Sequence, residues 1–224
     1  MSASPFDLLQ WLPERACEAF HAAARSRHFN PGELIYSQGD PGNQMYRLVS
    51  GAVRLSVARS DGRELLYLLF QPGDCFGTSS LVDGEMRPQT AEAHEACEVE
   101  MLGRVGFGQL RSMYREFDDA LIRLATRHMR LLSGLFADAH LEAISARVAS
   151  RILATTRSFG RPTSAGIALS VPLTQSELAL MVGGSRQTVN KVLQQFQADG
   201  LVNLSGGQII VLSTDRLRSM LSSE

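Results

Sequence analysis

The spacing of apolar residues in the C-terminal quarter of the chain predicts two short helices followed by a β-hairpin. Thr174 lies three residues before Glu177, which is the spacing of a capping box at a helix start. Gly183-Gly184 supply the backbone freedom for a tight turn, and Ser185 caps a second helix whose apolar residues recur at helical spacing. Two apolar runs then flank Ser205-Gly206-Gly207, as in a hairpin. This order predicts a winged helix-turn-helix.

A different pattern covers the first 105 residues. Residues 6–29 have mixed helical periodicity, whereas residues 30–105 consist of short alternating runs separated by turn residues such as Pro72-Gly73-Asp74. The clearest hairpin turns at Asp61-Gly62, and its second strand, residues 65–70, is apolar throughout and is expected to be buried. Short strands at this spacing predict a β jelly roll of about 75 residues.

A long helix is expected from Phe117 onward, because no Gly or Pro interrupts the helical pattern before Gly134. One apolar stripe runs from Phe117 to Leu135, and a second stripe lies beside it. So wide an apolar face needs two partners, the roll of the same subunit and the same helix of a second copy; a core helix buried within one chain is the alternative. The expected dimer interface is the second stripe, which consists of Ile122, Ala125, Met129, Leu132, Phe136 and Ala139.

Residues 144–159 continue as another amphipathic helix, and residues 161–166 are expected to connect it to the helix-turn-helix. The predicted fold class is therefore α+β, with three parts. An effector-sensing β jelly roll is expected over residues 1–116, a long dimerisation helix over 117–143, and a winged helix-turn-helix DNA-binding domain over 144–224.

Charge supports a nucleic-acid partner only for the last of these parts. The whole chain carries 22 basic and 23 acidic residues, a formal net charge of -1, which by itself argues against a polyanion. From Ile144 onward, however, eight basic residues stand against four acidic ones. This local excess is modest, and a dimer would double it.

Cysteine and histidine placement argues against a metal site. Cys17, Cys75 and Cys97 are far apart and lack the paired spacing of a zinc or iron–sulfur site. The five histidines are scattered; packing is their expected role, and a haem ligand among them is the alternative. The N-terminal residues do not show a basic segment followed by an apolar stretch, which is the pattern of a secretion signal. No apolar run approaches the roughly 18 residues of a membrane span. A soluble, cytoplasmic protein without a membrane partner is expected.

The polar face of the second helix carries the candidate DNA contacts. Arginine and lysine can bond the O6 and N7 atoms of guanine, and glutamine can bond N6 and N7 of adenine. Any helical hairpin with a polar face is the alternative interpretation. The expected base-reading residues are Arg186, Gln187, Asn190 and Lys191, and the expected phosphate contacts are Thr174, Gln175, Ser185 and Ser205.

The chain resembles the Crp/Fnr family of bacterial transcription regulators over nearly its whole length. The resemblance rests on GELIYSQGDPGNQMYRLVSGAVRLSV and PGDCFG in the roll and on GSRQTVNKVLQQF in the second helix. It implies a cyclic-nucleotide-binding-like roll, a dimerisation helix and a winged helix-turn-helix, in a homodimer that binds palindromic double-stranded DNA and acts on RNA polymerase. Family members usually carry Glu where Gln187 stands, so the resemblance also implies a different base preference at this position.

The same resemblance implies where an effector binds. Cyclic-AMP-binding members hold the ribose with the Glu of an FGE segment and the phosphate with an Arg-Ser pair. Here the segment reads FGTSSLVDGEMRPQTA, in which Gly77 and Arg87 match while Thr78 replaces the Glu and Pro88 replaces the Ser. One guanidinium remains, which argues against ordinary cyclic-AMP binding and leaves two roles open for Arg87. It either meets another nucleotide-type or small anionic effector or is a surface or ion-paired arginine.

The effector site is expected between the roll and the long helix, near Leu132 and Ser133. The oxygen-sensing branch needs an N-terminal cysteine cluster, which Cys17 alone cannot supply. A cupin-like enzyme would need clustered histidines, and residues 30–105 contain only His94. A nucleotide-sensing module that acts through protein partners is the other alternative. The favoured function is a homodimeric, sequence-specific DNA-binding regulator, not an enzyme, controlled by an unidentified small effector.

Overall fold

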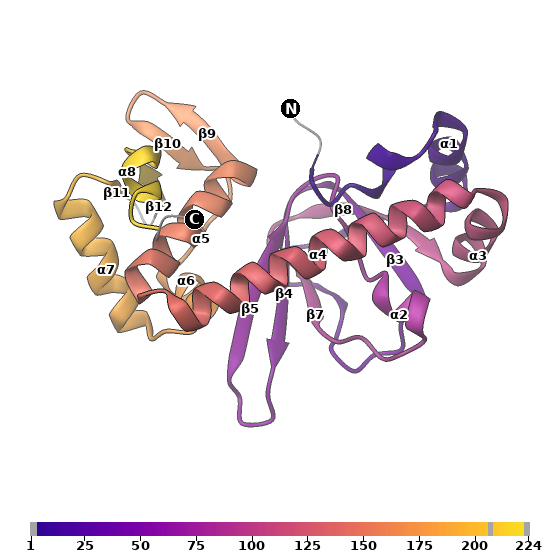
Figure 1. Ribbon diagram of the computed structural model, residues 1–224, viewed down its shortest axis with the longest axis horizontal. Helices are drawn as coiled ribbons and strands as arrows, with labels where there is room; N and C mark the ends of the chain where they lie inside the picture. The colour runs from indigo at the N-terminus through magenta and orange to yellow at the C-terminus, as the bar shows by residue number, and fades with distance from the viewer. Residues whose placement is uncertain (1–3, 206–207, 222–224) are drawn as a thin grey trace. The chain divides into compact units, whose positions relative to one another are not determined.

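A computed structural model describes residues 4–205 and 208–221 of the chain. The chain forms two compact units, of which the first contains residues 1–62 and 68–132 and the second contains 63–67 and 133–224. The long helix α4, Arg115–Leu141, begins in the first unit and ends in the second (Figure 1).

Two four-stranded sheets form the roll, and all of their residues belong to the first unit except residues 64–67. One sheet has the antiparallel order β1-β8-β3-β6, and the other has the order β2-β7-β4-β5. This arrangement confirms the predicted β roll. The strands of the two sheets are β1 Arg25–Phe29, β8 Cys97–Gly103, β3 Gln44–Ser50, β6 Cys75–Phe76, β2 Leu34–Tyr36, β7 Thr90–Ala93, β4 Val53–Ala58 and β5 Glu64–Phe70.

Two expectations for the roll were wrong. Arg25–Phe29 is not helical, because this charged segment pairs along its whole length with β8, from Arg25 opposite Met101 to Phe29 opposite Cys97. The pairing with a neighbouring strand overrides the local helical pattern. β5 is not buried throughout, since Leu65 is 44% exposed.

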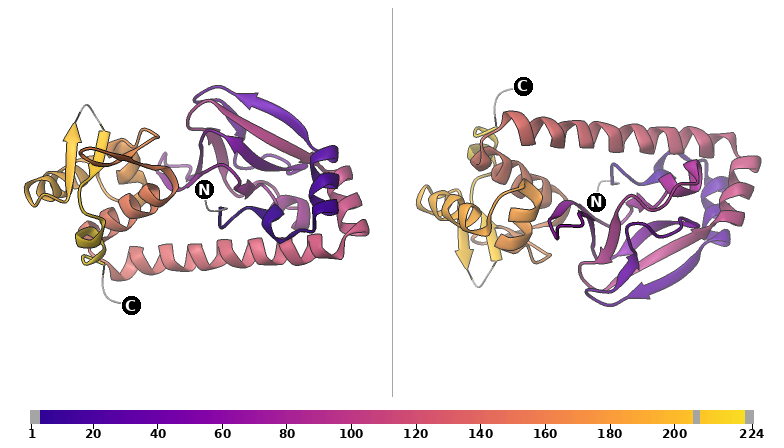
Figure 2. Two further views of the ribbon diagram at one scale, coloured as in Figure 1. Left: turned by 90° about the horizontal axis from the view of Figure 1, so that it is seen from above. Right: turned by 90° about the horizontal axis from the view of Figure 1, so that it is seen from below.

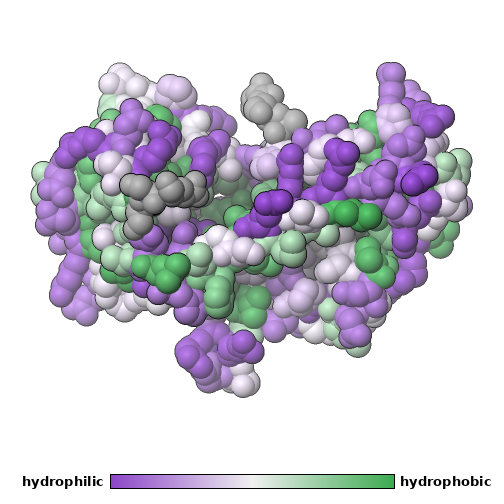
Figure 3. Space-filling view, viewed as in Figure 1, coloured by the Kyte–Doolittle hydropathy of each residue, from purple (hydrophilic) through white to green (hydrophobic). Residues whose placement is uncertain are grey.

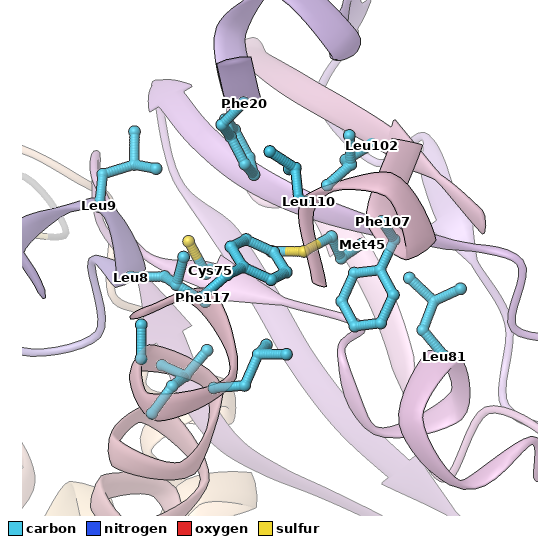
Figure 4. Close-up of a cluster of buried hydrophobic side chains, with 13 residues drawn as sticks. Leu8, Leu9, Phe20, Met45, Cys75, Leu81, Leu102, Phe107, Leu110 and Phe117 are labelled. Atoms are coloured by element: carbon cyan, nitrogen blue, oxygen red, sulfur yellow. The ribbon is translucent and has the colours of Figure 1, made fainter. Parts of the chain in front are cut away.

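Helices close one end of the roll around a hydrophobic core. The short helix η1, Leu8–Trp11, and α1, Glu14–Ala23, precede the roll, while α3, Arg104–Met113, follows it and lies beside α1 (Figure 1). In Figure 4, Phe117 of α4 and Phe107 of α3 point toward Met45 of β3. The two rings pack edge to face with centroids 5.6 Å apart. The N-terminal part of α4 is therefore fixed to the roll.

The second unit is a helical cluster with a small sheet. Its helices are α5 Ile144–Phe159, α6 Gln175–Val182, α7 Arg186–Ala198 and α8 Thr214–Arg218. Its sheet has the order β11-β12-β10-β9, formed by β11 Val202–Ser205, β12 Gln208–Val211, β10 Gly166–Leu169 and β9 Gly160–Thr163. In Figure 2 the yellow strands β11 and β12 lie beside α7.

The hairpin of β9 and β10 was missed, because residues 161–166 were expected to be a simple connector. β9 lies at the edge of the sheet, where Pro162, a residue without a backbone N–H, is tolerated. Gly166 permits the turn into β10 with a φ of +139°, and a Cβ there would come within 2.5 Å of the Val211 carbonyl oxygen. The predicted β11–β12 hairpin is present, whereas its Gly206-Gly207 turn lies outside the described residues.

Two titratable groups with shifted pKa values, the buried Asp74 and the half-buried His128, lie under the N-terminal segment of the roll. Asp74 is 3% exposed, accepts a hydrogen bond from Ser4 Oγ, and accepts another from the Gln71 N–H at 2.8 Å. Burial raises the pKa of Asp74 to about 7. His128 of α4 stacks on Phe6 with ring centroids 4.7 Å apart, and burial lowers the pKa of its imidazole to about 4.

These two shifts have opposite effects on stability. Between about pH 4 and 7 the folded state keeps a proton on Asp74 that the unfolded state releases, so this group lowers the free energy of unfolding as the pH rises. Between about pH 4 and 6.5 the unfolded state binds a proton at His128 that the folded state does not. His128 therefore raises the free energy of unfolding as the pH rises through the same range.

We expect the two variants Asp74→Asn and His128→Phe to separate these contributions. Denaturant unfolding at several pH values between 4.5 and 7.5 would measure the stability of wild type minus that of each variant. This difference should fall with rising pH for Asp74→Asn and rise for His128→Phe, each by roughly 1.4 kcal/mol per pH unit over the titrating range. Glu18→Gln, at an exposed position on α1, is the control. Differences that do not change with pH for Asp74→Asn and His128→Phe would contradict the prediction.

Candidate DNA-binding and effector sites

The turn between α6 and α7 has the predicted capping on both sides. Thr174 Oγ1 accepts the Glu177 N–H at 3.1 Å, and the Glu177 carboxylate accepts the Thr174 N–H at 2.8 Å, which confirms the capping box. Gly183 ends α6 in the left-handed region with a φ of +63°. Ser185 Oγ accepts the Thr188 N–H at 3.0 Å and so begins α7. The residue at which α7 begins is therefore fixed by this cap.

The polar face of α7 is presented as the sequence predicted. Val189, Leu193 and Phe196 are buried, which rotates the opposite face of the helix outward. On that face Arg186, Gln187 and Lys191 are exposed, while Asn190 is half-buried. Gln194 was not among the expected residues, although it is exposed and lies one turn beyond Asn190 and Lys191 on the same face.

The four expected phosphate contacts differ in how free their side chains are. Thr174 and Ser185 are exposed but already make the capping bonds of α6 and α7. Gln175 is half-buried in the first turn of α6, and Ser205 is exposed at the end of β11. All four residues lie at the ends of α6, α7 or β11. Their role as phosphate contacts stays a prediction.

Part of the basic excess in the second unit is structural. Arg147 of α5 donates to the carbonyl oxygen of Val182 at 2.8 Å and thereby holds the C-terminal end of α6. Burial lowers the pKa of Arg151, although the negative charge of Asp138 opposes this shift. The exposed guanidinium groups that a polyanion can reach directly include those of Arg157, Arg161, Arg186 and Arg216.

Arg87 is the centre of the candidate effector site in the roll. Its side chain is 2% exposed, and its Nη1 and Nη2 groups donate to the carbonyl oxygens of Gly77 and Gln44, each at 2.6 Å. The guanidinium carbon lies 4.3 Å from the ring centroid of Tyr36 and 5.8 Å from that of Tyr46. Arg87 is therefore neither the surface arginine nor the ion-paired arginine that the sequence left open.

The buried charge of Arg87 has no carboxylate partner among the described residues. Its Nε atom is also buried without a hydrogen-bond acceptor in this part of the chain. Gly77 is required beside it, because its φ is +73° and a Cβ would come within 2.8 Å of Arg87 Nη1. A buried cation with spare donor capacity is suited to an anion.

The other expected effector residues contribute less to this site. Thr78 begins the short helix α2, Ser79–Asp83, without capping it through its side chain, and Pro88 is exposed and has no N–H to donate. Leu132 and Ser133 are exposed on α4, and no hydrogen bond given for the described residues joins them to Arg87.

The expected dimer stripe on α4 is exposed over its whole length in the single chain. Met129 and Phe136 are 61% and 67% exposed, although both side chains are large and apolar. By contrast, Phe117 and Leu124 of the neighbouring stripe are buried against the roll. The remaining stripe residues, Ile122, Ala125, Leu132 and Ala139, are exposed as well.

Neither a metal-binding cluster nor a membrane-spanning helix is found in the described part of the chain. Among residues 4–205 and 208–221, no three His, Cys, Asp or Glu side chains gather so that they could hold a metal ion. Within the same ranges, none of the helices combines the length and the apolar character that crossing a membrane requires.

The sequence matches two family models. Residues 26–114 match the cyclic nucleotide-binding domain, and residues 146–220 match the Crp-like helix-turn-helix domain. The chain is 32% identical over 192 residues to a CRP-like cAMP-activated global transcriptional regulator of Mycobacterium tuberculosis, with 84% of each chain covered. It is also 32% identical over 196 residues to the cyclic AMP receptor protein of Thermus thermophilus, covering 83% of this chain and 82% of the relative.

Solved structures share the fold. FixK2 from Bradyrhizobium japonicum matches with a TM-score of 0.80 at 23% identity, over 90% of this chain and 98% of that one. A CRP-family transcriptional regulator from Thermus thermophilus matches with a TM-score of 0.76 at 27% identity, over 88% of this chain and 97% of that one. Proteins of this kind are transcription regulators and not enzymes. The chain belongs to the Crp/Fnr family of DNA-binding transcription regulators.

Proposed function

We propose that this regulator is a cytoplasmic homodimer that binds a palindromic site in double-stranded DNA, acts on RNA polymerase, and responds to a small anionic effector. The observation that carries sequence-specific binding is the outward polar face of α7. Arg186, Gln187 and Lys191 are exposed there on a helix whose start is fixed by the Ser185 cap. Side chains in the first turns of such a helix reach base edges in the major groove.

The dimer is supported by the apolar stripe of α4. Its six residues follow the alternating three- and four-residue spacing of a coiled-coil seam and are all exposed in one chain. Burying a large apolar side chain such as Met129 or Phe136 contributes roughly 1.5 to 3 kcal/mol. A two-fold pairing of this stripe with its copy would give the two α7 helices the symmetry of a palindromic site.

Selection from a library of two-fold symmetric DNA, followed by gel-shift titration at two salt concentrations, tests this function. We expect one palindromic consensus, an affinity that falls with salt, and two protein chains per DNA duplex. Absence of salt-dependent binding to any sequence would contradict the proposal. That result would favour the alternative of a nucleotide-sensing module acting through protein partners.

The effector is proposed to be an anion held by Arg87. Both relatives described above are named for cyclic AMP. In this chain, however, Thr78 lacks the carboxylate that cyclic-AMP-binding members use at its position, and Pro88 lacks the hydroxyl that they use at the other position. The buried, uncompensated guanidinium of Arg87 retains the anion-binding half of that site. We infer a nucleotide-type or other small anionic effector whose charged group replaces the carbonyl contacts of Arg87.

We expect Arg87→Leu to abolish the response to this effector. A thermal-shift screen with cyclic nucleotides, cyclic dinucleotides and small carboxylates would identify a stabilising anion, whose affinity should fall at least tenfold in the variant. Arg104→Leu is the matched control, because this arginine of the roll is exposed and also donates to a backbone carbonyl. If Arg87→Leu does not fold, Arg87→Lys, which keeps the positive charge, is measured in its place. An affinity that survives the substitution of Arg87 would place the effector elsewhere.

A further inference from the structure

An open groove of about 290 Å³ lies on the first unit beside α4. It is lined by Trp11 of η1 and by one side of α4, namely Ile122, Arg123, Thr126, Arg127 and Arg130. Three of its six lining residues are arginines spaced at i, i+4 and i+7 on one helix. In Figure 3 strongly hydrophilic side chains gather along one edge of the middle of α4. The groove is therefore a concentrated positive surface, and neither Arg87 nor α7 belongs to it.

Within the described part of the chain, the arginines of this groove have no ion-pair partners. Among the carboxylates in the first turns of α4, Glu116 pairs with Arg15 at 3.3 Å and Asp118 pairs with Arg111 at 2.6 Å. Asp119 lies one turn before Arg123, and no ion pair between the two is given among the described residues. Three like charges along two helical turns repel one another unless an anion binds them.

Arg127 is already held in position. Its guanidinium carbon lies 4.7 Å from the ring centroid of Trp11, and its Nη1 donates to the carbonyl oxygen of Pro5 at 2.6 Å. The remaining N–H groups of this guanidinium are left for a ligand. A donor fixed in advance loses less conformational entropy when it binds.

The three arginines of the groove project from a side of α4 that differs from the two sides already assigned. With 100° per residue, Arg123, Arg127 and Arg130 centre about 105° away from the buried residues of α4 that face the roll and about 155° away from the centre of the apolar stripe. Occupation of the groove by a ligand at the arginines therefore does not require the roll to open. The groove and the apolar stripe meet at Ile122, which lines the groove and also belongs to the stripe.

We propose that this groove binds an oligophosphate, meaning a chain of several linked phosphates, either free or attached to a nucleoside. Arg123 and Arg130 are separated by about 10 Å along the helix axis, a span that suits several charged groups in a row rather than one. Guanidinium groups bind phosphate oxygens in bidentate geometry. Because Arg127 already occupies a face of the Trp11 ring, recognition runs through the phosphates and not through stacking of a base.

Trp11 is the single tryptophan of the chain, so its fluorescence reports on the groove directly. Full-length protein is titrated with inorganic tripolyphosphate, with ATP and with sodium chloride at matched ionic strength. We expect a saturable fluorescence change with tripolyphosphate that sodium chloride does not reproduce. A similar affinity for ATP would assign binding to the phosphate chain, whereas binding of ATP alone would overturn the phosphate-based recognition.

Matched variants locate the site. Arg123→Gln combined with Arg130→Gln should weaken the apparent affinity about tenfold. Arg25→Gln combined with Arg59→Gln removes the same charge from two exposed positions outside the groove and should leave the affinity unchanged.

An equal loss in both pairs, or no saturable change in the wild type, would overturn the proposal. So would loss of the response in Arg87→Leu, because binding would then belong to the roll. Gel shifts with the same variants measure DNA binding separately. A failure of the oligophosphate proposal can therefore be distinguished from a failure of the proposed DNA-binding function.

Discussion

Phe136→Glu and Met129→Glu are each expected to convert the protein from a dimer to a monomer. Both side chains lie on the apolar stripe of α4 and are more than half exposed in the single chain. In a symmetric pairing every substitution occurs twice, so two carboxylates would face each other at the seam. The variant therefore loses the burial of two large side chains and adds a like-charge contact in an apolar environment.

The loss of the dimer should reduce DNA affinity strongly. A monomer contacts only one half-site, whereas the dimer contacts two half-sites through one binding event. We expect the affinity for the palindrome to fall at least hundredfold, within the range that linkage of two binding modules provides. Affinity for a single half-site should change little, because α7 itself is untouched.

Analytical ultracentrifugation and gel shifts would measure the two effects. Ala137→Glu is the matched control, because it places the same charge at an exposed position of α4 that does not belong to the stripe. This control should remain dimeric with wild-type affinity. An unchanged dimer mass for both Phe136→Glu and Met129→Glu would show that the chain pairs through another surface.

Helical elements could be predicted from the sequence because their signals are local. α5 spans residues 144–159 as its apolar spacing predicted, and the Thr174–Glu177 capping box forms with both of its hydrogen bonds. A cap or an amphipathic stripe depends on residues within one or two turns. The polar face of α7 followed from the same periodicity, which is why its exposed residues could be named in advance.

Features that depend on distant partners could not be predicted. Arg25–Phe29 becomes a strand only because β8, more than sixty residues later, offers an edge to it. The burial of Arg87 depends on Gln44 and on the rings of Tyr36 and Tyr46, which come from other strands of the roll. The motif around Gly77 located this arginine but could not show that backbone carbonyls hold it.

The base preference at Gln187 is expected to differ from that of regulators with Glu at this position. Gln187 is exposed in the first turn of α7, next to Arg186, where side chains meet base edges. A carboxylate only accepts hydrogen bonds and suits the amino group of cytosine. The amide of Gln187 both donates and accepts, which matches N7 and N6 of adenine. Selection from random DNA should therefore return an A·T pair opposite Gln187.

We expect Gln187→Glu to move this preference to C·G while the rest of the consensus is retained. One bidentate contact discriminates by about 1 to 3 kcal/mol, so the ratio of affinities for the two sites should change by roughly tenfold or more. Gel-shift titration of wild type and variant on both sites gives this ratio. Gln175→Ala is a matched control, because a phosphate contact should weaken all sequences about equally. If wild type and Gln187→Glu select the same base pair with the same ratio of affinities, Gln187 does not read a base, and Arg186, Asn190 and Lys191 remain the base-reading candidates.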